Sequence, residues 1–197
     1  AELMMNGMVR PENIADFSGR IYKEANRLGN LVADIIQLSR LDEQQDAVVS
    51  MESVELDELA KDVVNNLRDH AEKKNISLDY CGIPINIQGV RHVLYEMLYN
   101  IADNAVRYTN PGGHIHIYVG RKGDRPFYRV EDDGIGIPKS EQKRIFERFY
   151  RVDKSHSRQT GGTGLGLSIV KHGATLHHAQ INVDSDLGKG TKMELLF

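Results

Sequence analysis

The sequence predicts an α+β fold: an α/β sandwich in which a mixed sheet carries helices on one face, preceded by a partial helical hairpin. Hydrophobic residues recur at helical spacing between residues 13 and 42. The rest of the chain interleaves helical segments with short alternating segments typical of strands. Several of these strand segments follow one another directly, so a doubly wound parallel sheet is not predicted.

The helical segment at 13–42 has apolar positions every three, four or seven residues, the spacing of a coiled coil or helical bundle. Pro11 suits the first turn of this helix, and Asn6-Gly7 suits the end of a helix before it. A lone hairpin buries little apolar surface, so we expect it to pair with a second copy; packing on its own domain is the alternative. The apolar seam comprises Ile14, Phe17, Ile21, Leu28, Val32, Ile35 and Leu38.

The polar stretch Asp42–Val49 is the predicted linker between two domains, at 1–45 and 46–197. Residues 1–8 resemble the end of a helix already under way, so we expect the chain to be a piece of a longer protein. Asp57 is expected to cap a helix, and 133–162 shows few regular signals apart from a short helical stretch near 141–149. The expected strands are 54–56, 76–80, 83–88, 114–119, 127–131, 179–185 and 191–197, with helices at 57–74, 91–108 and 165–176 and a turn at 110–113.

The composition excludes several kinds of partner and site. The formal net charge is -3, so we predict no nucleic-acid partner. Cys81 is the only cysteine, which rules out a disulfide within the chain and a cysteine-rich zinc site. No apolar run approaches the ~18 residues of a membrane span and no signal-peptide pattern is present, so we expect no direct membrane contact by this chain.

The first of three glycine-containing or polar clusters is Glu131–Pro138. A predicted strand delivers Asp132 to a point where Gly134 and Gly136 permit tight backbone geometry. A carboxylate held there can accept a hydrogen bond from a purine amino group, and the glycines let the ring approach closely. A calcium loop is the alternative, but common calcium loops need more oxygen ligands at alternate positions.

The second cluster, Gly161–Ser168, contains several glycines and runs straight into a predicted helix. Its backbone N–H groups and the helix N-terminus favour an anion such as a triphosphate. It is not a P-loop, because no Gly-Lys-Ser/Thr follows at the required spacing. A dinucleotide fingerprint would have to follow the first strand of a βαβ unit, whereas this cluster follows a long loop.

The third cluster lies on the predicted helix 91–108. Asn100 and Asn104 are four residues apart, so their amides share one face, and Arg107 follows within a turn. Neutral oxygen ligands beside a polyphosphate suit Mg²⁺, which keeps several waters. A solvated polar stripe is the alternative for this helix taken alone.

In this order the three clusters resemble the Bergerat-type ATP-binding fold of histidine kinases, type II topoisomerases, a heat-shock chaperone and mismatch-repair ATPases. The finer resemblance is to bacterial two-component sensor histidine kinases. It rests on segments similar to that family's N box (100–104), first glycine box (132–136), F box (146–150), second glycine box (162–166) and a small glycine motif (188–191).

The resemblance implies a site for ATP and Mg²⁺. Asp132 would bind the adenine amino group, Asn104 would hold Mg²⁺, and Asn100 would help to bind the phosphates. Residues 138–160 would form a lid that Phe146 and Phe149 pin to the domain, and Arg148 or Arg151 would reach the γ-phosphate. The implied ATP-binding residues are Asn100, Asn104, Arg107, Tyr108, Asp132, Gly134, Gly136, Ile137, Arg148, Tyr150, Gly162, Thr163, Gly164, Leu165, Gly166, Leu167 and Thr191.

The activity implied is transfer of the γ-phosphoryl group of ATP to a histidine, and onward to an aspartate of a response-regulator receiver domain. The parent protein would be a homodimer through its N-terminal helices, and this chain the cytoplasmic region of a membrane-anchored bacterial sensor. The acceptor histidine normally stands in a His-Glu/Asp-x-x-Thr/Asn-Pro context, which none of the eight histidines has. We therefore expect this chain to bind nucleotide but not to phosphorylate itself.

Three alternatives remain open at this stage. An anti-sigma-type serine kinase shares the fold, although the hairpin at 13–42 argues against it. A non-catalytic nucleotide-binding or dimerisation module is disfavoured by the intact Asn104 and Asp132. A chaperone- or repair-type ATPase would need a general base, for which Glu96 is the only candidate in a suitable place.

Overall fold

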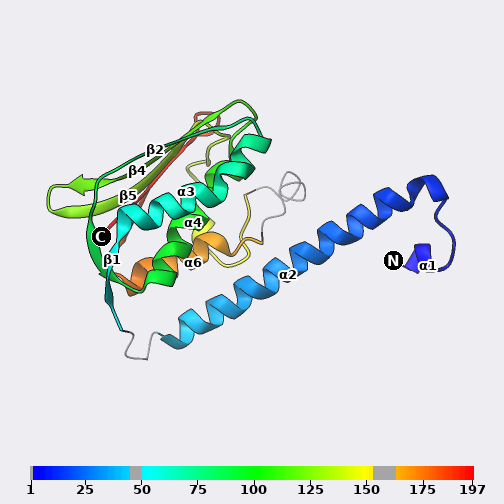
Figure 1. The fold of residues 1–197 in the computed structure, drawn as a ribbon, viewed down its shortest axis with the longest axis horizontal. Coiled ribbons are helices and arrows are strands. Elements are labelled where there is room, and N and C mark those ends of the chain that lie inside the picture. Colours follow the sequence, from blue (N-terminus) through cyan, green and yellow to red (C-terminus); the bar gives the residue numbers. More distant parts are fainter. Residues whose placement is uncertain (1, 45–49, 153–162) are drawn as a thin grey trace.

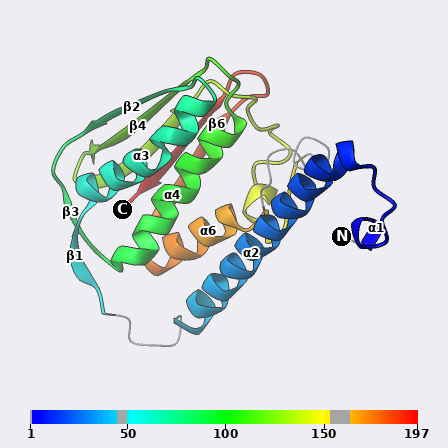
Figure 2. The same cartoon turned by 45° about the vertical axis from the view of Figure 1, so that its right-hand side comes forward.

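The computed structural model describes residues 2–44, 50–152 and 163–197. It consists of a long N-terminal helix and a two-layer α/β sandwich (Figure 1). The helix α2 (Ile14–Gln44) runs beside the sandwich and contacts it along α6 (Gly166–Leu176), as the turned view in Figure 2 shows. Leu31 of α2 packs against the core of the sandwich at this contact.

The helix end that the sequence predicts before α2 is present in the structure. The short helix α1 (Glu2–Met5) is followed by a turn at Asn6-Gly7, in which Gly7 has a φ of 66°. The Met8 N–H donates to the Leu3 carbonyl at 2.9 Å, which closes the end of the helix in the manner of a Schellman motif. Pro11 then opens the 3₁₀ turn η1 (Pro11–Asn13), which leads directly into α2.

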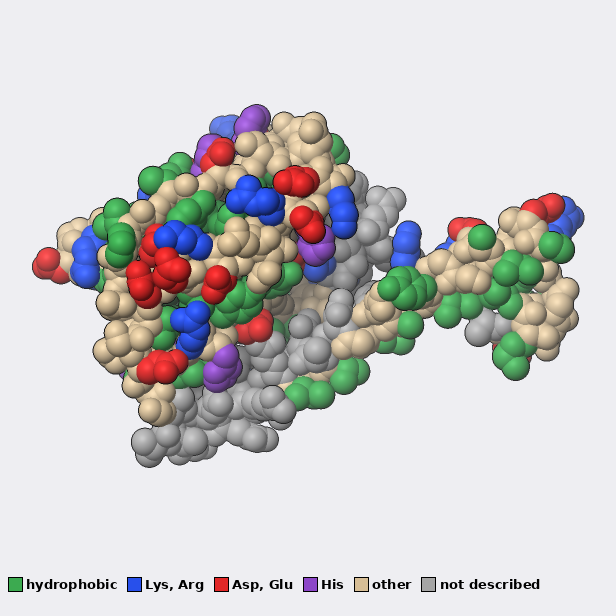
Figure 3. All heavy atoms as spheres, in the orientation of Figure 1, with side chains coloured by type: hydrophobic (Ala, Val, Ile, Leu, Met, Phe, Trp, Pro, Cys, Tyr) green, Lys and Arg blue, Asp and Glu red, His purple; other side chains and the backbone are tan. Residues whose placement is uncertain are grey.

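Most of the predicted apolar seam of α2 is exposed to solvent. Ile14, Ile21, Leu28, Val32 and Ile35 are each at least 40% exposed. Phe17 is half-buried, and the side chain of Leu38 lies outside the described ones. Figure 3 shows hydrophobic side chains gathered along the α2 arm. Such a row in water favours association, so pairing with a second copy remains our expectation.

The main sheet has five strands in the order β2-β4-β5-β7-β6. Strands β2 and β4 are parallel and the other neighbours are antiparallel, which is the mixed sheet that the sequence predicts. A separate antiparallel pair, β1 with β3, connects α2 to the sandwich region. The strands are β1 (Glu52–Glu55), β2 (Ser77–Gly82), β3 (Asn86–Gly89), β4 (His114–Lys122), β5 (Arg125–Asp132), β6 (Gln180–Ser185) and β7 (Thr191–Leu196).

Three helices, α3 (Leu56–Lys73), α4 (Arg91–Tyr108) and α6, cover one face of this sheet (Figures 1 and 2). Along β4, Ile115, Ile117 and Val119 are buried, because alternate side chains of a strand point to the helical layer. On β5 the fully buried Tyr128 donates its hydroxyl to the Leu98 carbonyl of α4 at 3.1 Å. The predicted fold class is confirmed.

Some element boundaries differ from those expected. Helix α3 begins at Leu56, and Asp57 does not cap it. Instead Asp57 is buried in the first turn, where its carboxylate accepts hydrogen bonds from the Tyr80 hydroxyl and from Lys61 Nζ. The side chain therefore bonds to Tyr80 of β2 and to its i+4 neighbour Lys61, and a capping pattern in the sequence reveals neither partner.

Two further expectations were wrong in extent. The strand expected at 83–88 is the shorter β3, because Gly82 still belongs to β2 and Pro84 separates the two strands. The helical stretch expected near 141–149 is only the 3₁₀ turn η2 (Arg144–Phe146). Phe149 adopts a φ of 62°, which is incompatible with a continuing right-handed helix. Among the described residues, no helix has the length and apolarity needed to cross a membrane.

A half-buried histidine joins the end of α6 to the start of α4. His177 Nδ1 donates to the Gly173 carbonyl at 2.7 Å, and Nε2 accepts the Val90 N–H at 3.0 Å. Only neutral imidazole can make both bonds. Burial lowers the pKa of His177, and the neighbouring His178 and His92 lower it further, against the opposing effect of the Gly173 bond.

This clip makes stability depend on pH. The folded pKa of His177 lies below the ordinary value that it has in the unfolded chain. The stabilisation is therefore fully present above the ordinary value and is lost as pH falls from there through the folded pKa. We expect the melting temperature to fall on acidification from about pH 7 to about pH 5.5, by about 2–4 °C for each kcal/mol lost. A His177→Gln variant, whose amide oxygen can still accept the Val90 N–H, should show a smaller fall. An equal fall in both proteins, measured by calorimetry, would contradict this.

The exposed seam generates a second prediction. Val32→Glu places a charge in the middle of the apolar row and should shift the chain from dimer to monomer in sedimentation experiments. Lys23→Glu, an exposed change on the same helix outside the seam, is the matched control and should leave the dimer intact. A monomeric unmodified chain, or a dimer that survives Val32→Glu, would refute seam pairing.

Candidate functional site

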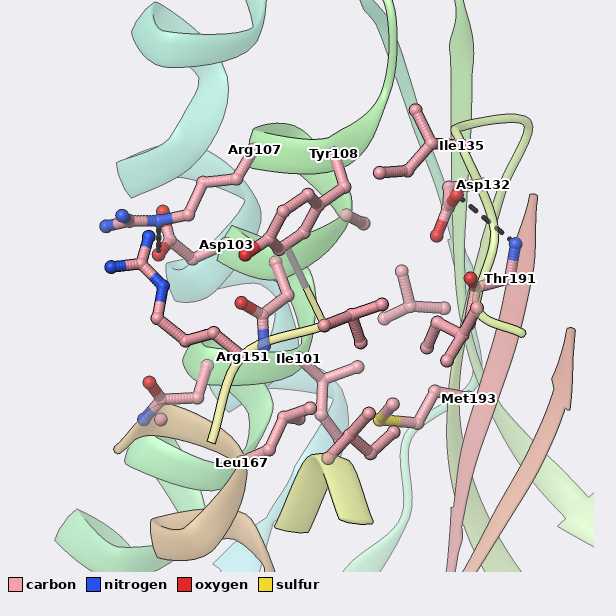
Figure 4. Close-up of a pocket in the computed structure, with 18 of the residues that line it drawn as sticks. Ile101, Asp103, Arg107, Tyr108, Asp132, Ile135, Arg151, Leu167, Thr191 and Met193 are labelled. Carbon is pink, nitrogen blue, oxygen red and sulfur yellow. Dashed lines mark hydrogen bonds and ion pairs between the residues drawn. The ribbon is translucent and has the colours of Figure 1, made fainter. Parts of the chain in front are cut away.

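A cavity of about 790 Å³ opens between α4, the loop that follows β5, the first residues of α6 and strand β7 (Figure 4). Its apolar wall combines α4, α6 and the sheet, and includes Ile101, Leu167 and Met193. Its polar residues come from α4 and from the glycine-containing loops. The cavity therefore joins the three clusters that the sequence singled out.

Helix α4 contributes one face to this cavity. Asn100, Asn104, Arg107 and Tyr108 all line it, as their spacing predicts. The Asn100 amide donates to the Glu96 carbonyl at 2.8 Å, so its Nδ2 is held by its own helix. A Cβ at Gly166 would lie only 2.5 Å from Asn100 Oδ1, so a larger residue at the start of α6 would have to displace the Asn100 side chain.

Asp132 lies half-buried at the end of β5. Its Oδ1 accepts hydrogen bonds from the N–H groups of Gly134 at 2.9 Å and Thr191 at 3.2 Å, which fix the orientation of the carboxyl group. Burial raises the pKa of Asp132 to about 6, although these two bonds oppose the rise. A carboxylate that is fixed and poorly solvated gains most from a ligand that brings its own N–H donor.

The neighbouring Asp133 is directed elsewhere. Its carboxylate accepts the His114 backbone N–H at 2.8 Å and lies 2.9 Å from His114 Nδ1. The His114 backbone N–H is the main cause that holds the pKa of Asp133 below its ordinary value. Asp133 does not line the cavity, so the geometry separates the two adjacent carboxylates that the sequence could distinguish only by resemblance.

The glycines around Asp132 allow two loops to touch. Gly136 has a φ of 68°, and a Cβ there would lie 2.0 Å from the Asp186 carbonyl oxygen. Gly190 has a φ of 87°, and its Cβ would lie 1.9 Å from the Asp132 carbonyl oxygen. Both positions therefore require glycine. The Gly188 N–H donates to the Ile135 carbonyl at 2.8 Å and joins the β6–β7 turn to the loop after β5.

The charged groups are divided between two sides of the cavity. Figure 4 shows Arg107, Asp103 and Arg151 on one side and Asp132 with Thr191 on the other. Arg107 Nε lies 2.5 Å from Asp103 Oδ2, an i,i+4 pair on α4. One side is thus suited to an anionic group and the other to a hydrogen-bond donor.

Most of the predicted site residues meet at this cavity; three described ones do not, and one lies outside the described residues. Gly134 packs against the Tyr108 carbonyl, Leu165 is fully buried, Arg148 is not part of the lining, and Gly162 lies outside the described residues. The predicted residues that line the cavity are Glu96, Asn100, Asn104, Arg107, Tyr108, Asp132, Gly136, Ile137, Tyr150, Thr163, Gly164, Gly166, Leu167 and Thr191.

The lid expected at 138–160 lies partly outside the described residues, and of its two expected anchor residues one contacts the core. Phe146 packs against the core, whereas Phe149 is 58% exposed and does not. The Phe149 N–H instead donates to the Gly164 carbonyl at 2.9 Å, which joins the two chain segments that flank residues 153–162. Of the two arginines considered for the γ-phosphate, Arg151 lines the cavity.

Sequence reasoning missed the apolar lining and one carboxylate. Val130 and Met193 point to the same face as Asp132 and Thr191, so strand alternation could have identified them. Asp103 could have been found from its i,i+4 spacing to Arg107. Loop residues such as Leu187 carried no such signal. The missed residues are Tyr99, Ile101, Asp103, Ala105, Val130, Ile135, Pro138, Ile145, Val152, Leu187 and Met193.

Residues 89–197 match the family described as "Histidine kinase-, DNA gyrase B-, and HSP90-like ATPase". The chain belongs to this family. SenX3 of Mycobacterium tuberculosis (strain H37Rv), a sensor-like histidine kinase, is 36% identical over 197 residues, covering 99% of this chain and 48% of SenX3. The chain spans about half the length of the SenX3 relatives it matches.

Solved structures agree with this membership. Mycobacterial sensor histidine kinase MprB matches with a TM-score of 0.65 and 26% identity, over 75% of this chain and 96% of that one. Full-length ShkA, solved in complex with AMPPNP, matches with a TM-score of 0.75 and 26% identity, over 92% of this chain and 38% of that one. The resemblance to sensor histidine kinases that the boxes indicated is confirmed, and the anti-sigma alternative is not favoured.

The raised pKa of Asp132 predicts that its negative charge lowers the stability of the chain near neutral pH. Because its folded pKa is higher than its ordinary value, its contribution to stability is largest in acid and is lost as pH rises through about 6. Asp132→Asn keeps an oxygen acceptor for both backbone N–H groups and removes the charge. We expect this variant to melt at a higher temperature than the unmodified chain near pH 7.5, with the difference shrinking towards pH 4. A variant that is less stable than the unmodified chain at both pH values would refute a raised pKa for Asp132.

Proposed function

We propose that this cavity binds Mg-ATP and that the chain is the ATP-binding catalytic region of a sensor histidine kinase. The observation that carries the proposal is the polarity of the cavity, with a fixed carboxylate on one side and, on the other, two arginines together with Asp103, which pairs with Arg107. ATP has the matching polarity, because its adenine amino group donates hydrogen bonds and its triphosphate is anionic.

The base end is formed by Asp132 and apolar residues. The carboxylate accepts the adenine amino group, while Ile135, Ile137 and Met193 supply apolar surface for the ring. The two backbone N–H groups that hold Asp132 Oδ1 keep the acceptor in place before the ligand arrives. Such preorganisation increases affinity because little order is lost on binding.

The phosphate end combines side chains with a helix terminus. Arg107 and Arg151 supply positive charge, and the first residues of α6 supply backbone N–H groups and the positive end of a helix dipole. Full-length ShkA, part of which shares this fold, was solved in complex with AMPPNP, which is consistent with nucleotide binding.

A group of polar side chains on α4 is suited to magnesium. Glu96, Asn100 and Asn104 follow one another at intervals of four residues on α4 and all line the cavity. Oxygen ligands of this kind, few in number, suit Mg²⁺, which retains waters and binds phosphate oxygens. We assign the protein ligand to Asn104. Bound Mg²⁺ would neutralise phosphate charge during transfer.

The proposed reaction moves the γ-phosphoryl group to a histidine of the parent protein. A neutral imidazole nitrogen attacks the γ-phosphorus, the bond from that phosphorus to the β–γ bridging oxygen breaks, and ADP leaves. Arg151 and Arg107 would stabilise the equatorial and leaving oxygens. The phosphoryl group would then pass to an aspartate of a response-regulator receiver domain.

The N-terminal part would act as the dimerisation domain. We propose that residues 1–45 belong to a dimerisation and phosphotransfer hairpin and 46–197 to the catalytic domain, with α2 pairing through its exposed seam. In this scheme the chain is the cytoplasmic region of a membrane-anchored sensor. None of its histidines has the acceptor context, so it should not phosphorylate itself.

Titration calorimetry with AMPPNP tests the proposal. We expect binding that is tighter with Mg²⁺ than with a chelator, and that Asp132→Asn weakens at least about a hundredfold, because its amide would turn a donor or a neutral acceptor towards the adenine amino group. Asn104→Ala should reduce the magnesium effect and leave the magnesium-free affinity nearly unchanged. No binding by the folded, unmodified chain would refute the proposal.

A further inference from the structure

A half-buried lysine from another helix closes the end of α4. Lys74, the residue that follows α3, reaches across to the C-terminus of α4, more than thirty residues later in the chain. Its Nζ donates hydrogen bonds to the carbonyl oxygens of Val106 at 2.7 Å, Arg107 at 2.9 Å and Thr109 at 3.0 Å. All three N–H groups of the ammonium are therefore used.

These carbonyls need a partner from outside the helix. The last four carbonyls of an α-helix have no acceptor role within it, and a cation at this end also interacts favourably with the helix dipole. The remaining carbonyl in this run, that of Tyr108, accepts the Ile135 N–H at 3.2 Å. Lys74 and the loop after β5 thus hold four consecutive carbonyls between them.

The same short segment carries part of the cavity wall. Arg107 and Tyr108, whose backbone lies within this set of bonds, both line the cavity, and so does Ile135. Gly134 is packed so tightly on the segment that a Cβ there would lie 2.5 Å from the Tyr108 carbonyl oxygen. A shift of the α4 terminus would therefore displace both the arginine and the loop that begins at Asp132.

Two side chains fix the position of Arg107, one through its backbone and one through its guanidinium group. Lys74 holds its backbone, and Asp103 pairs with its guanidinium. The arrangement brings two cations close together: burial lowers the pKa of Lys74, and the charge of Arg107 lowers it further. Hydrogen bonds from a charged donor are stronger than neutral ones, so the three bonds from Lys74 Nζ constrain this segment.

We propose that Lys74 is a positioning residue for nucleotide binding, which acts through the C-terminus of α4 without touching the nucleotide. Lys74 does not line the cavity. The inference rests on the proposed function, since the property it alters is affinity for the phosphate-bearing ligand. Its expected target is the phosphate end, where Arg107 lies.

The test compares two adjacent lysines. Lys74→Met removes the three donors while keeping much of the side-chain volume, and Lys73→Met, at an exposed position on the same turn, is the matched control. We expect Lys74→Met to raise the dissociation constant for ADP by about tenfold or more at a temperature where circular dichroism shows it folded, because hydrogen bonds to a charged donor are lost. Lys73→Met should leave the constant unchanged.

A double-mutant cycle separates positioning from general destabilisation. If Lys74 acts through Arg107, then Lys74→Met combined with Arg107→Ala should weaken ADP binding by clearly less than the product of the two single effects. Lys74→Arg, which retains charged donors, should recover most of the lost affinity. If Lys74→Met fails to fold, Lys74→Gln takes its place in the cycle.

The outcomes are distinct. ADP binding that is equal in the unmodified and Lys74→Met chains, or independent multiplicative effects of the Lys74 and Arg107 changes, would overturn the positioning role alone. Failure of the unmodified chain to bind ADP would overturn the proposed function and this inference together. Reduced affinity with strong coupling to Arg107 and recovery by arginine supports the role.

Discussion

The site depends on the packing of α4 between two other helices and the sheet. Its inner face is anchored by fully buried residues such as Leu94, Met97 and Leu98, and Tyr128 ties its middle to β5 through the Leu98 carbonyl. These contacts fix the rotation of the helix about its own axis. Because 3.6 residues make one turn, that rotation decides which side chains face the cavity, and Asn100, Asn104 and Arg107 follow from it.

The other walls are arranged around this helix. Gly166 lets α6 begin against Asn100, and Gly134 lets the loop after β5 reach the end of α4. The β6–β7 turn then closes on that loop through Gly136 and Gly190. At Gly134, Gly136 and Gly190 a Cβ would meet backbone atoms, so glycine is a steric requirement at these three positions.

Much of this arrangement was predictable because it rests on local spacing. The face shared by Asn100 and Asn104 follows from helix geometry, and the place of Asp132 follows from a strand that ends in glycines. The sandwich class follows from the order of the elements. The roles of ATP and Mg²⁺ came from resemblance to a family, and residue spacing alone left a polar stripe or a calcium loop as alternatives.

Other features depend on contacts between distant segments, which a single sequence does not show. The buried partnership of Asp57 with Tyr80, the clip at His177 and the cap formed by Lys74 each join elements far apart in the chain. Phe149 fits no repeating pattern: its backbone is left-handed, and its N–H bonds to the carbonyl of Gly164, which lies much farther along the chain than a helical partner would. Such tertiary constraints override local preference at the places where the cavity is closed.

The most direct test of the account is an NMR titration of the Asp132 side-chain carboxyl carbon, with and without saturating ADP. The structure places its pKa near 6 in the free chain because the group is buried. An adenine amino group donating to the carboxylate favours the charged form, so ADP should lower this pKa, whereas inosine diphosphate, which lacks the amino group, should not. A pKa that is the same with ADP as without it would contradict the assignment of Asp132 to the adenine and with it the orientation of the nucleotide in the cavity.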